Sequence, residues 1–157
     1  MRLTIYTDYA FRVLMQVSLA DGELVRIADI AKTFGISHSH LTKVVHNLGT
    51  LGFLKTVQGR NGGMYLAKSA KEITVGQIVR AFEPDFRMVE CFDAGTASCR
   101  LQPACVLKHV LHKETEHMLD RLDQTTLADL VRPSKQLHLL LTTTAGRSSA
   151  DRSRHAG

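Results

Sequence analysis

Apolar residues recur at helical spacing in several stretches of the chain. The first stretch, residues 8–20, carries Asp8 in its first turn, where an acidic side chain is favourable. Two later stretches, residues 74–84 and 104–122, have the same spacing and also predict helices. A shorter closing helix is expected at residues 125–131. The pattern therefore indicates a mainly α-helical protein.

Two further short helices lie close together in the first third of the chain. Residues 26–34 are amphipathic, and Gly35 follows them, the residue type that commonly ends a helix by adopting positive φ. Ser37 can then cap a third helix over residues 37–52. Two short helices joined by a tight turn that contains glycine predict a helix-turn-helix over about residues 26–51.

A β-hairpin is expected directly after these helices. Residues 53–58 and 64–68 have the composition of strands, and residues 59–63 between them are rich in glycine and asparagine. Both residue types tolerate positive φ, as a hairpin turn requires. A wing over residues 53–68 after a helix-turn-helix defines the fold class: mainly α with a small β wing, a winged helix-turn-helix followed by a long helix.

Charge suggests what the helix-turn-helix binds. The chain has a formal net charge of +5, and residues 30–71 contain lysine and arginine but neither aspartate nor glutamate. A segment of one sign attracts polyanions, so we predict that it binds double-stranded DNA; the alternative is a solvated basic surface without a partner. The candidate DNA-binding residues are polar and lie on the exposed face of the third helix or at the hairpin tip: Ser37, His38, Ser39, His40, Thr42, Lys43, His46, Asn47, Arg60 and Asn61.

The helix over residues 104–122 is longer than one winged module can cover. Its apolar seam contains Leu111, Met118 and Leu122, and Thr115 interrupts it. A second copy of the same helix is the expected cover, so this is a dimerisation helix and the protein is predicted to be a homodimer. The alternative is packing of this helix against the first helix of its own chain.

Other features limit the class of protein. Residues 142–157 are small, polar or charged and are expected to be a disordered tail, which leaves a regulator domain over residues 1–141. No run approaches the roughly 20 apolar residues of a membrane span, and the N-terminus has no signal-peptide organisation. We therefore expect a cytoplasmic protein without a membrane partner. No nucleotide-binding loop or nucleophile motif is present, so no enzyme is expected.

All three cysteines, Cys91, Cys99 and Cys105, lie in one polar segment over residues 88–105. Thiols stay reduced in the cytoplasm, so metal or redox chemistry is favoured over disulfides. Soft thiolates select zinc, copper(I) or iron–sulfur clusters. The gaps of seven and five residues are wider than the closely spaced cysteine pairs of zinc sites. A cluster normally needs four protein ligands, so a fourth would come from elsewhere.

Three other interpretations of these cysteines stay open. The thiols could be unligated, although the surrounding segment is not apolar as inert buried cysteines usually require. Zinc could be held with His109 or His112 as a fourth ligand. A catalytic thiol would need a base at a defined spacing, and no such pattern is present.

Six stretches in combination resemble the iron–sulfur winged-helix repressors, the family of the cluster-biogenesis regulator IscR. They are MRLTIYTDYAFRVL, SHSHLTKVVHNL, GRNGGMYLAK, TVGQIVRAFEP, PACVLKHVL and TLADLV, and the similarity extends from residue 1 to about residue 141. The resemblance implies a transcriptional repressor with one iron–sulfur cluster per subunit, either 2Fe–2S or 4Fe–4S. It also implies that Cys91, Cys99 and Cys105 are cluster ligands.

Within this family the chain is most similar to the nitric-oxide-sensitive repressors. Members like IscR have a histidine ligand where this chain has Lys108. The nitric-oxide-sensitive members share the TDYA stretch, and their aspartate is implicated as a ligand donated across the dimer. This implies that Asp8 of the partner subunit is the fourth ligand; its other role would be an ion pair with Arg12, four residues on. The gap between Cys91 and Cys99 is longer than is typical of the family, so the cluster type stays open.

The resemblance also implies a signal. Nitric oxide would attack the cluster, and the dimer would release DNA and allow expression of nitrosative-stress genes. Two alternatives remain: a regulator of the same family that senses iron or cluster status, and a thiol or zinc redox regulator.

Overall fold

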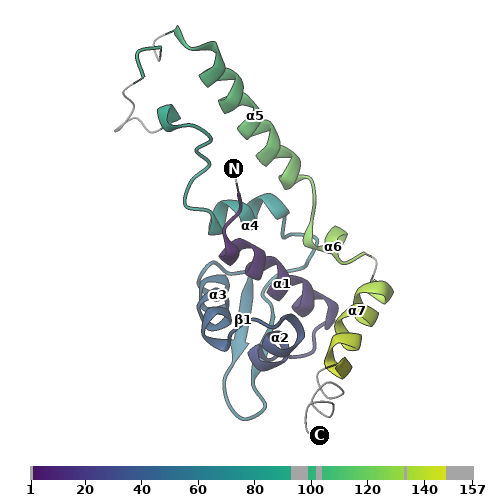
Figure 1. Ribbon diagram of the computed structural model, residues 1–157. Coiled ribbons are helices and arrows are strands. Elements are labelled where there is room, and N and C mark those ends of the chain that lie inside the picture. The colour runs from purple at the N-terminus through teal and green to yellow at the C-terminus, as the bar shows by residue number, and fades with distance from the viewer. Residues whose placement is uncertain (1, 93–98, 102–103, 133, 148–157) are drawn as a thin grey trace, which may run out of the picture.

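The structure, a computed structural model, describes residues 2–92, 99–101, 104–132 and 134–147. Figure 1 shows a base, made of the helices near both chain ends and the wing, and an arm made mainly of α5. The elements in chain order are α1 (Ile5–Leu19), α2 (Ile27–Phe34), α3 (His38–Thr50), β1 (Leu54–Val57), β2 (Gly63–Leu66), α4 (Val75–Phe82), the 3-10 helix η1 (Glu90–Phe92), α5 (Val106–Asp123), α6 (Leu127–Leu130) and α7 (Ser134–Arg147).

The core of the base surrounds one face of α1. This helix packs against α3, α4, β2 and α6. Its apolar residues follow the spacing of three or four that places side chains on a single helix face. The fully buried apolar residues are Ala10, Val13, Leu14, Ile30, Leu41, Val44, Leu48, Ile73, Ile78 and Leu127.

The helix-turn-helix forms as the sequence predicts. Gly35 ends α2 with φ of 64°, a left-handed conformation that glycine adopts without a steric penalty. Ser37 caps α3, and its side chain accepts a hydrogen bond from the backbone N–H of His40. The predictions for both residues are confirmed.

The wing is a two-stranded antiparallel sheet in which Lys55 pairs with Tyr65 and Thr56 pairs with Met64. Its strands are shorter than predicted, but the hairpin is confirmed. Met64 also bridges to Val25, which ties the wing to the segment before α2. Gly63 makes this approach possible, since a Cβ there would lie 2.8 Å from the Val25 carbonyl oxygen.

The arm joins the base where the end of α5 meets the start of α4. Arg80 forms an ion pair with Asp123 at 2.7 Å, and the Thr74 hydroxyl donates to the same carboxylate at 3.2 Å. Gly76 lies directly beneath, and a Cβ at this position would lie 2.0 Å from an oxygen of Asp123. The carboxylate that joins the arm to the base therefore occupies the space that a Cβ at position 76 would fill.

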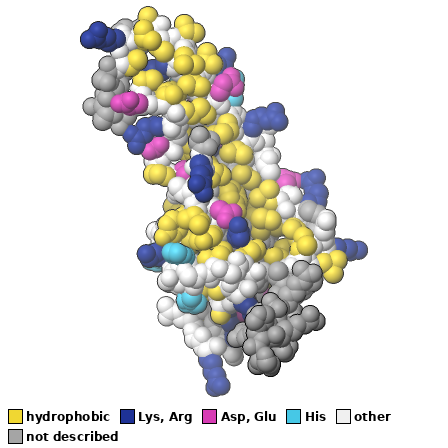
Figure 2. Space-filling model, in the orientation of Figure 1, with side chains coloured by type: hydrophobic (Ala, Val, Ile, Leu, Met, Phe, Trp, Pro, Cys, Tyr) yellow, Lys and Arg dark blue, Asp and Glu magenta, His cyan; other side chains and the backbone are white. Residues whose placement is uncertain are grey.

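The long helix differs in one respect from the predicted seam. Thr115 does not interrupt an outward apolar face; it is buried within its own chain, and its hydroxyl donates to the Leu111 carbonyl at 2.9 Å. The apolar side chains that α5 exposes are instead Val106, Leu107 and Val110, near its N-terminal end. Figure 2 shows hydrophobic side chains continuing from the arm over the base. Neither α5 nor any other helix in the described part of the chain is long and apolar enough to cross a membrane.

The helices at the two chain ends have other bounds than the sequence pattern predicts. α1 begins at Ile5, capped by Thr4, although Asp8 keeps its place in the first turn. α7 extends from Ser134 to Arg147 and so overlaps the start of the tail predicted from residue 142, whose disorder stays a prediction. The rest of the predicted tail, 148–157, lies outside the described residues.

A Gly76→Ala substitution tests the joint between base and arm. The added methyl group should displace Asp123 and lower the free energy of unfolding by about 1–3 kcal/mol, as overpacking typically does. Gly49→Ala in α3 is the matched control, because no atom lies within 4 Å of its Cβ position. The control should be neutral or stabilise by up to about 1 kcal/mol. Urea unfolding followed by circular dichroism measures the free energy of unfolding of both variants. Equal free energies would contradict the close contact between Gly76 and Asp123.

Candidate nucleic-acid interface and cysteine segment

The exposed face of α3 carries the predicted DNA-binding residues. The helix buries Leu41, Val44, Val45 and Leu48 on one side. The polar residues that it exposes on the other side, together with its N-cap, are Ser37, His38, Ser39, His40, Thr42, Lys43, His46 and Asn47. The structure thus brings these predicted residues together on one surface that contains no carboxylate.

Some of these side chains form hydrogen bonds within the chain, and others do not. The Thr42 hydroxyl donates to the His38 carbonyl at 2.8 Å, which limits what it can offer a partner. Within the described residues, Lys43, His46 and Asn47 have no side-chain hydrogen bond or ion pair. A cation, an imidazole and an amide at successive exposed positions are the groups that bind phosphates and base edges.

The wing tip and the start of α3 border one groove. Arg60 and Asn61 are both exposed at the tip, as predicted. A cavity of about 350 Å³ extends from Arg60 to His38 of α3 and Arg26 at the start of α2. Arg26 is not among the residues that the sequence pattern predicted for DNA binding. The pattern shows only that Arg26 is the first residue of the predicted helix-turn-helix.

Two aromatic residues of α1 contact the exposed face of α3. The rings of Tyr6 and Tyr9 each lie with their centroids 6.2 Å from that of His40. Between them in sequence is Asp8, which forms an ion pair with Arg12 at 2.8 Å. The start of α1 is therefore in contact with a predicted DNA-binding residue, a relation that the sequence pattern did not predict.

The start of α1 is fixed to the end of α4 by Glu83. One Glu83 carboxylate oxygen accepts from the Thr4 backbone N–H at 2.8 Å and from the Thr4 hydroxyl at 3.2 Å. It also accepts from the hydroxyl of Thr7, which is fully buried. Buried polar groups are costly unless they are paired, so this cluster fixes the first turn that carries Asp8.

Cys91 lies in η1, and Cys105 directly precedes α5. In Figure 1 the N-terminal end of α5 is the end of the arm that points away from the base. All three are free thiols: Cys91 and Cys105 are half-buried and Cys99 is exposed. Cys105 caps α5 without a side-chain hydrogen bond to the helix. Upstream, hydrogen bonds from the side chain and backbone of Arg87 hold the pKa of Asp85 below its usual value.

The structure does not bring the three sulfurs into one cluster. Over residues 2–92, 99–101, 104–132 and 134–147, no group of three or more Cys, His, Asp or Glu side chains could hold a metal ion. Part of the segment between Cys91 and Cys99 lies outside these ranges. Asp8 of the same chain is occupied by Arg12 and is not part of the cysteine segment. The ligand assignments therefore stay predictions.

A model of the Rrf2 family, described as iron-dependent transcriptional regulators, matches residues 3–133. The chain belongs to the Rrf2 family. The helix-turn-helix transcriptional regulator NsrR of Bacillus licheniformis is 46% identical over 142 residues, which cover 90% of this chain and 99% of that protein. NsrR of Bacillus subtilis is 45% identical over the same length and is covered to 97%.

Solved structures of two other proteins have the same fold. IscR of T. potens superposes with a TM-score of 0.69 at 23% identity, covering 87% of this chain and 90% of that one. CymR, the global cysteine regulator of B. subtilis, superposes with a TM-score of 0.68 at 21% identity, covering 84% and 97%. The predicted winged-helix fold class is confirmed, and the protein is a DNA-binding transcriptional regulator rather than an enzyme.

An Arg60→Ala substitution tests the role of the wing tip in this Rrf2 regulator. We expect affinity for DNA to fall by about 1 kcal/mol, or roughly fivefold, with unchanged sequence preference, because a phosphate contact carries no base information. The slope of log affinity against log salt should shrink by about 0.9. Fluorescence anisotropy with a duplex selected by the wild-type protein measures both. Arg132→Ala, two residues after the end of α6, is the control for charge. Identical salt slopes for the wild type and both variants would exclude Arg60 from the interface.

Proposed function

We propose that this Rrf2 regulator is a homodimeric repressor of nitrosative-stress genes that senses nitric oxide through an iron–sulfur cluster. The observation that carries the proposal is the set of three free thiols, all at least partly accessible, in one segment of the arm. The nitric-oxide-sensitive repressors that the sequence resembles are the NsrR proteins, and over 142 residues this chain is 45–46% identical to those of two Bacillus species.

The donor set suits such a cluster. Cys91, Cys99 and Cys105 supply three soft ligands, and none is tied up in a disulfide. Cys105 is the N-cap residue of α5, and its side chain makes no hydrogen bond to the helix that a metal ligand would have to break. When bound, the cluster would supply the iron that reacts with nitric oxide.

Asp8 of the partner subunit is the proposed fourth ligand. The carboxylate of Asp8 is half exposed, and its ion pair with Arg12 is exposed too, so exchanging that partner costs little. The Glu83 cluster fixes the helical turn on which Asp8 lies. The Asp8 carboxylate can therefore bind the cluster of the partner subunit without rearrangement of α1.

The exposed apolar surface supports a dimer. Val106 is 74% exposed and Leu107 is 61% exposed at the start of α5, next to the cysteine segment. Ile5, at the start of α1, is 59% exposed. A second copy that covers these residues would bring the start of α1 of one chain toward the cysteine segment of the other, as shared ligation requires.

A contact route to the DNA-binding surface also exists. Tyr6 and Tyr9 flank Asp8 in sequence, and both rings contact His40 of α3. If the Asp8 carboxylate exchanged one binding partner for another, the first turns of α1 would shift. Tyr6 and Tyr9 would then move His40, which lies on the surface that faces DNA. This is the physical basis that we propose for release of DNA.

Anaerobically purified protein provides the main test. We expect a coloured protein that contains iron and sulfide and binds a duplex selected by the wild-type protein. Nitric oxide should then lower that affinity by roughly 5- to 150-fold, the usual range of allosteric coupling. A colourless protein that contains zinc, or iron-loaded protein that responds to chelator and ignores nitric oxide, would instead support one of the two alternative regulators.

Asp8→Ala tests the fourth ligand separately. The variant should retain less iron per chain and show a changed visible spectrum, since one ligand is lost. Arg12→Gln separates the two roles of Asp8, because it removes the ion pair but keeps the carboxylate, and its spectrum should match that of wild type. Asp29→Ala, which removes the acid from the first turn of α2, is the control for charge. An Asp8→Ala spectrum and iron content equal to those of wild type would exclude Asp8 as a ligand.

A further inference from the structure

The cavity of about 350 Å³ between the wing and the start of α2, here named the α2–wing groove, gathers groups that can carry positive charge. Arg26, His38 and Arg60 line it from three different parts of the chain, and none of its lining residues is acidic. Like charges that converge in one groove repel each other unless an anion lies between them. We propose that the groove holds one phosphate of the DNA backbone and that Arg26 is a further DNA-contacting residue. The proposal rests on DNA binding by this Rrf2 regulator and not on the iron–sulfur cluster.

The backbone places Arg26 beside the wing. The N–H of Val25 donates to the Met64 carbonyl at 3.0 Å, and the N–H of Met64 donates to the Val25 carbonyl at 2.8 Å. Both residues are buried, so this crossing is anchored in the core. Arg26 follows directly as the N-cap residue of α2, with an extended backbone. The start of the Arg26 side chain is therefore fixed at the edge of the wing whose tip carries Arg60.

The two arginines of the groove have no partner within the described part of the chain. Both are exposed, and neither has a side-chain hydrogen bond or ion pair there. The first turn of α2 adds donors to the same groove, because no side chain caps it and the backbone N–H groups of Ile27 and Ala28 are unpaired among the described residues. Guanidinium groups and unpaired N–H groups of a helix both bind phosphate oxygens. Asp29, an acid in the same turn, does not line the groove.

The position of the α2–wing groove suits a duplex that α3 contacts. The groove is lined by His38, the first residue of α3, and by Val45, from the buried side of the same helix. In Figure 1 the wing projects from the end of the base that points away from the arm, so the groove is not on the surface assigned to the dimer. A phosphate bound here would set the position of α3 along the duplex without carrying base information itself.

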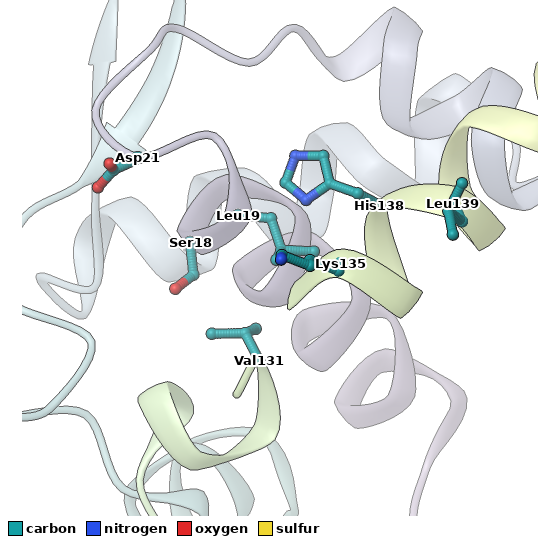
Figure 3. A pocket seen from close by; sticks show the side chains of 7 residues that line it. All are labelled: Ser18, Leu19, Asp21, Val131, Lys135, His138 and Leu139. Carbon is teal, nitrogen blue, oxygen red and sulfur yellow. The ribbon is translucent and has the colours of Figure 1, made fainter. Parts of the chain in front are cut away.

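Charge of one sign distinguishes this groove from the larger cavity of about 690 Å³ between α1 and α7, shown in Figure 3. That cavity is lined by an acid and a base, Asp21 and Lys135, and both are exposed. In Figure 3 the Asp21 carboxylate points away from the other lining residues. Water satisfies two such charges of opposite sign, whereas the cations of the α2–wing groove attract an anion.

Arg26→Gln tests the contact with a duplex selected by the wild-type protein. Affinity should fall roughly fivefold, the upper end of what one exposed ion pair contributes, with unchanged sequence preference. The slope of log affinity against log salt should shrink by about 0.9. Arg26→Lys keeps the charge and should keep the wild-type slope. The Arg26 side chain does not cap α2, so urea unfolding of Arg26→Gln should match that of wild type.

Uncharged methylphosphonate linkages, placed one at a time along the duplex, locate the bound phosphate. For each bound subunit, one position should weaken binding of the wild-type protein roughly fivefold. The double variant Arg26→Gln/Arg60→Gln should lose less than about twofold at that position, because it has already lost the contact. Lys32→Gln, in the last turn of α2, removes a charge that does not line the groove and should keep the wild-type sensitivity there.

Two results would overturn the inference. One is an Arg26→Gln protein with the affinity and salt slope of wild type. The other is a double variant that is as sensitive as wild type to every linkage. In either case the wild-type protein would still bind its selected duplex, so DNA binding by this regulator would stand while the phosphate site would not.

Discussion

The burial of one face of α1 is the contact on which the rest of the structure depends. Val13, Leu14 and Val17 pack into the core that α3, α4, β2 and α6 complete. Each fully buried side chain of this kind contributes about 1.5–3 kcal/mol relative to an exposed one. The same helix carries Asp8 and the two tyrosines that contact His40, so one packed helix connects the proposed cluster ligand to the surface of α3.

Two small polar clusters determine how the other elements meet α1. Glu83 accepts hydrogen bonds from Thr4 and Thr7 and thereby fixes the first turn of the helix to α4. Asp123 contacts Arg80 and Thr74 and so sets the direction of the arm. The apolar core alone would define neither the orientation of α1 against α4 nor the direction of the arm, because hydrophobic contacts have little directional preference.

The proposed function divides the work between base and arm. In that proposal, α3 and the wing tip of the base contact DNA, and the cysteines beside the N-terminal end of α5 hold the cluster. In the proposed dimer, ligation of one cluster by both chains would couple the two parts, since Asp8 and the tyrosines that contact His40 share the first two turns of α1. The geometry thus allows a chemical event in the arm to reach the DNA-binding surface through a single helix.

The sequence by itself determined the elements and their local signals. Gly35 and Ser37 mark helix ends because their backbone and side-chain chemistry acts over a few residues, and the exposed face of α3 follows from helical periodicity. The three cysteines of one short segment are likewise visible in the sequence, and they are the predicted ligand set. Only the tertiary structure decided that Thr115 is buried, that Gly76 lies against the Asp123 carboxylate and that Tyr6 and Tyr9 contact His40. Each of these contacts depends on residues distant in sequence, which a local pattern does not encode.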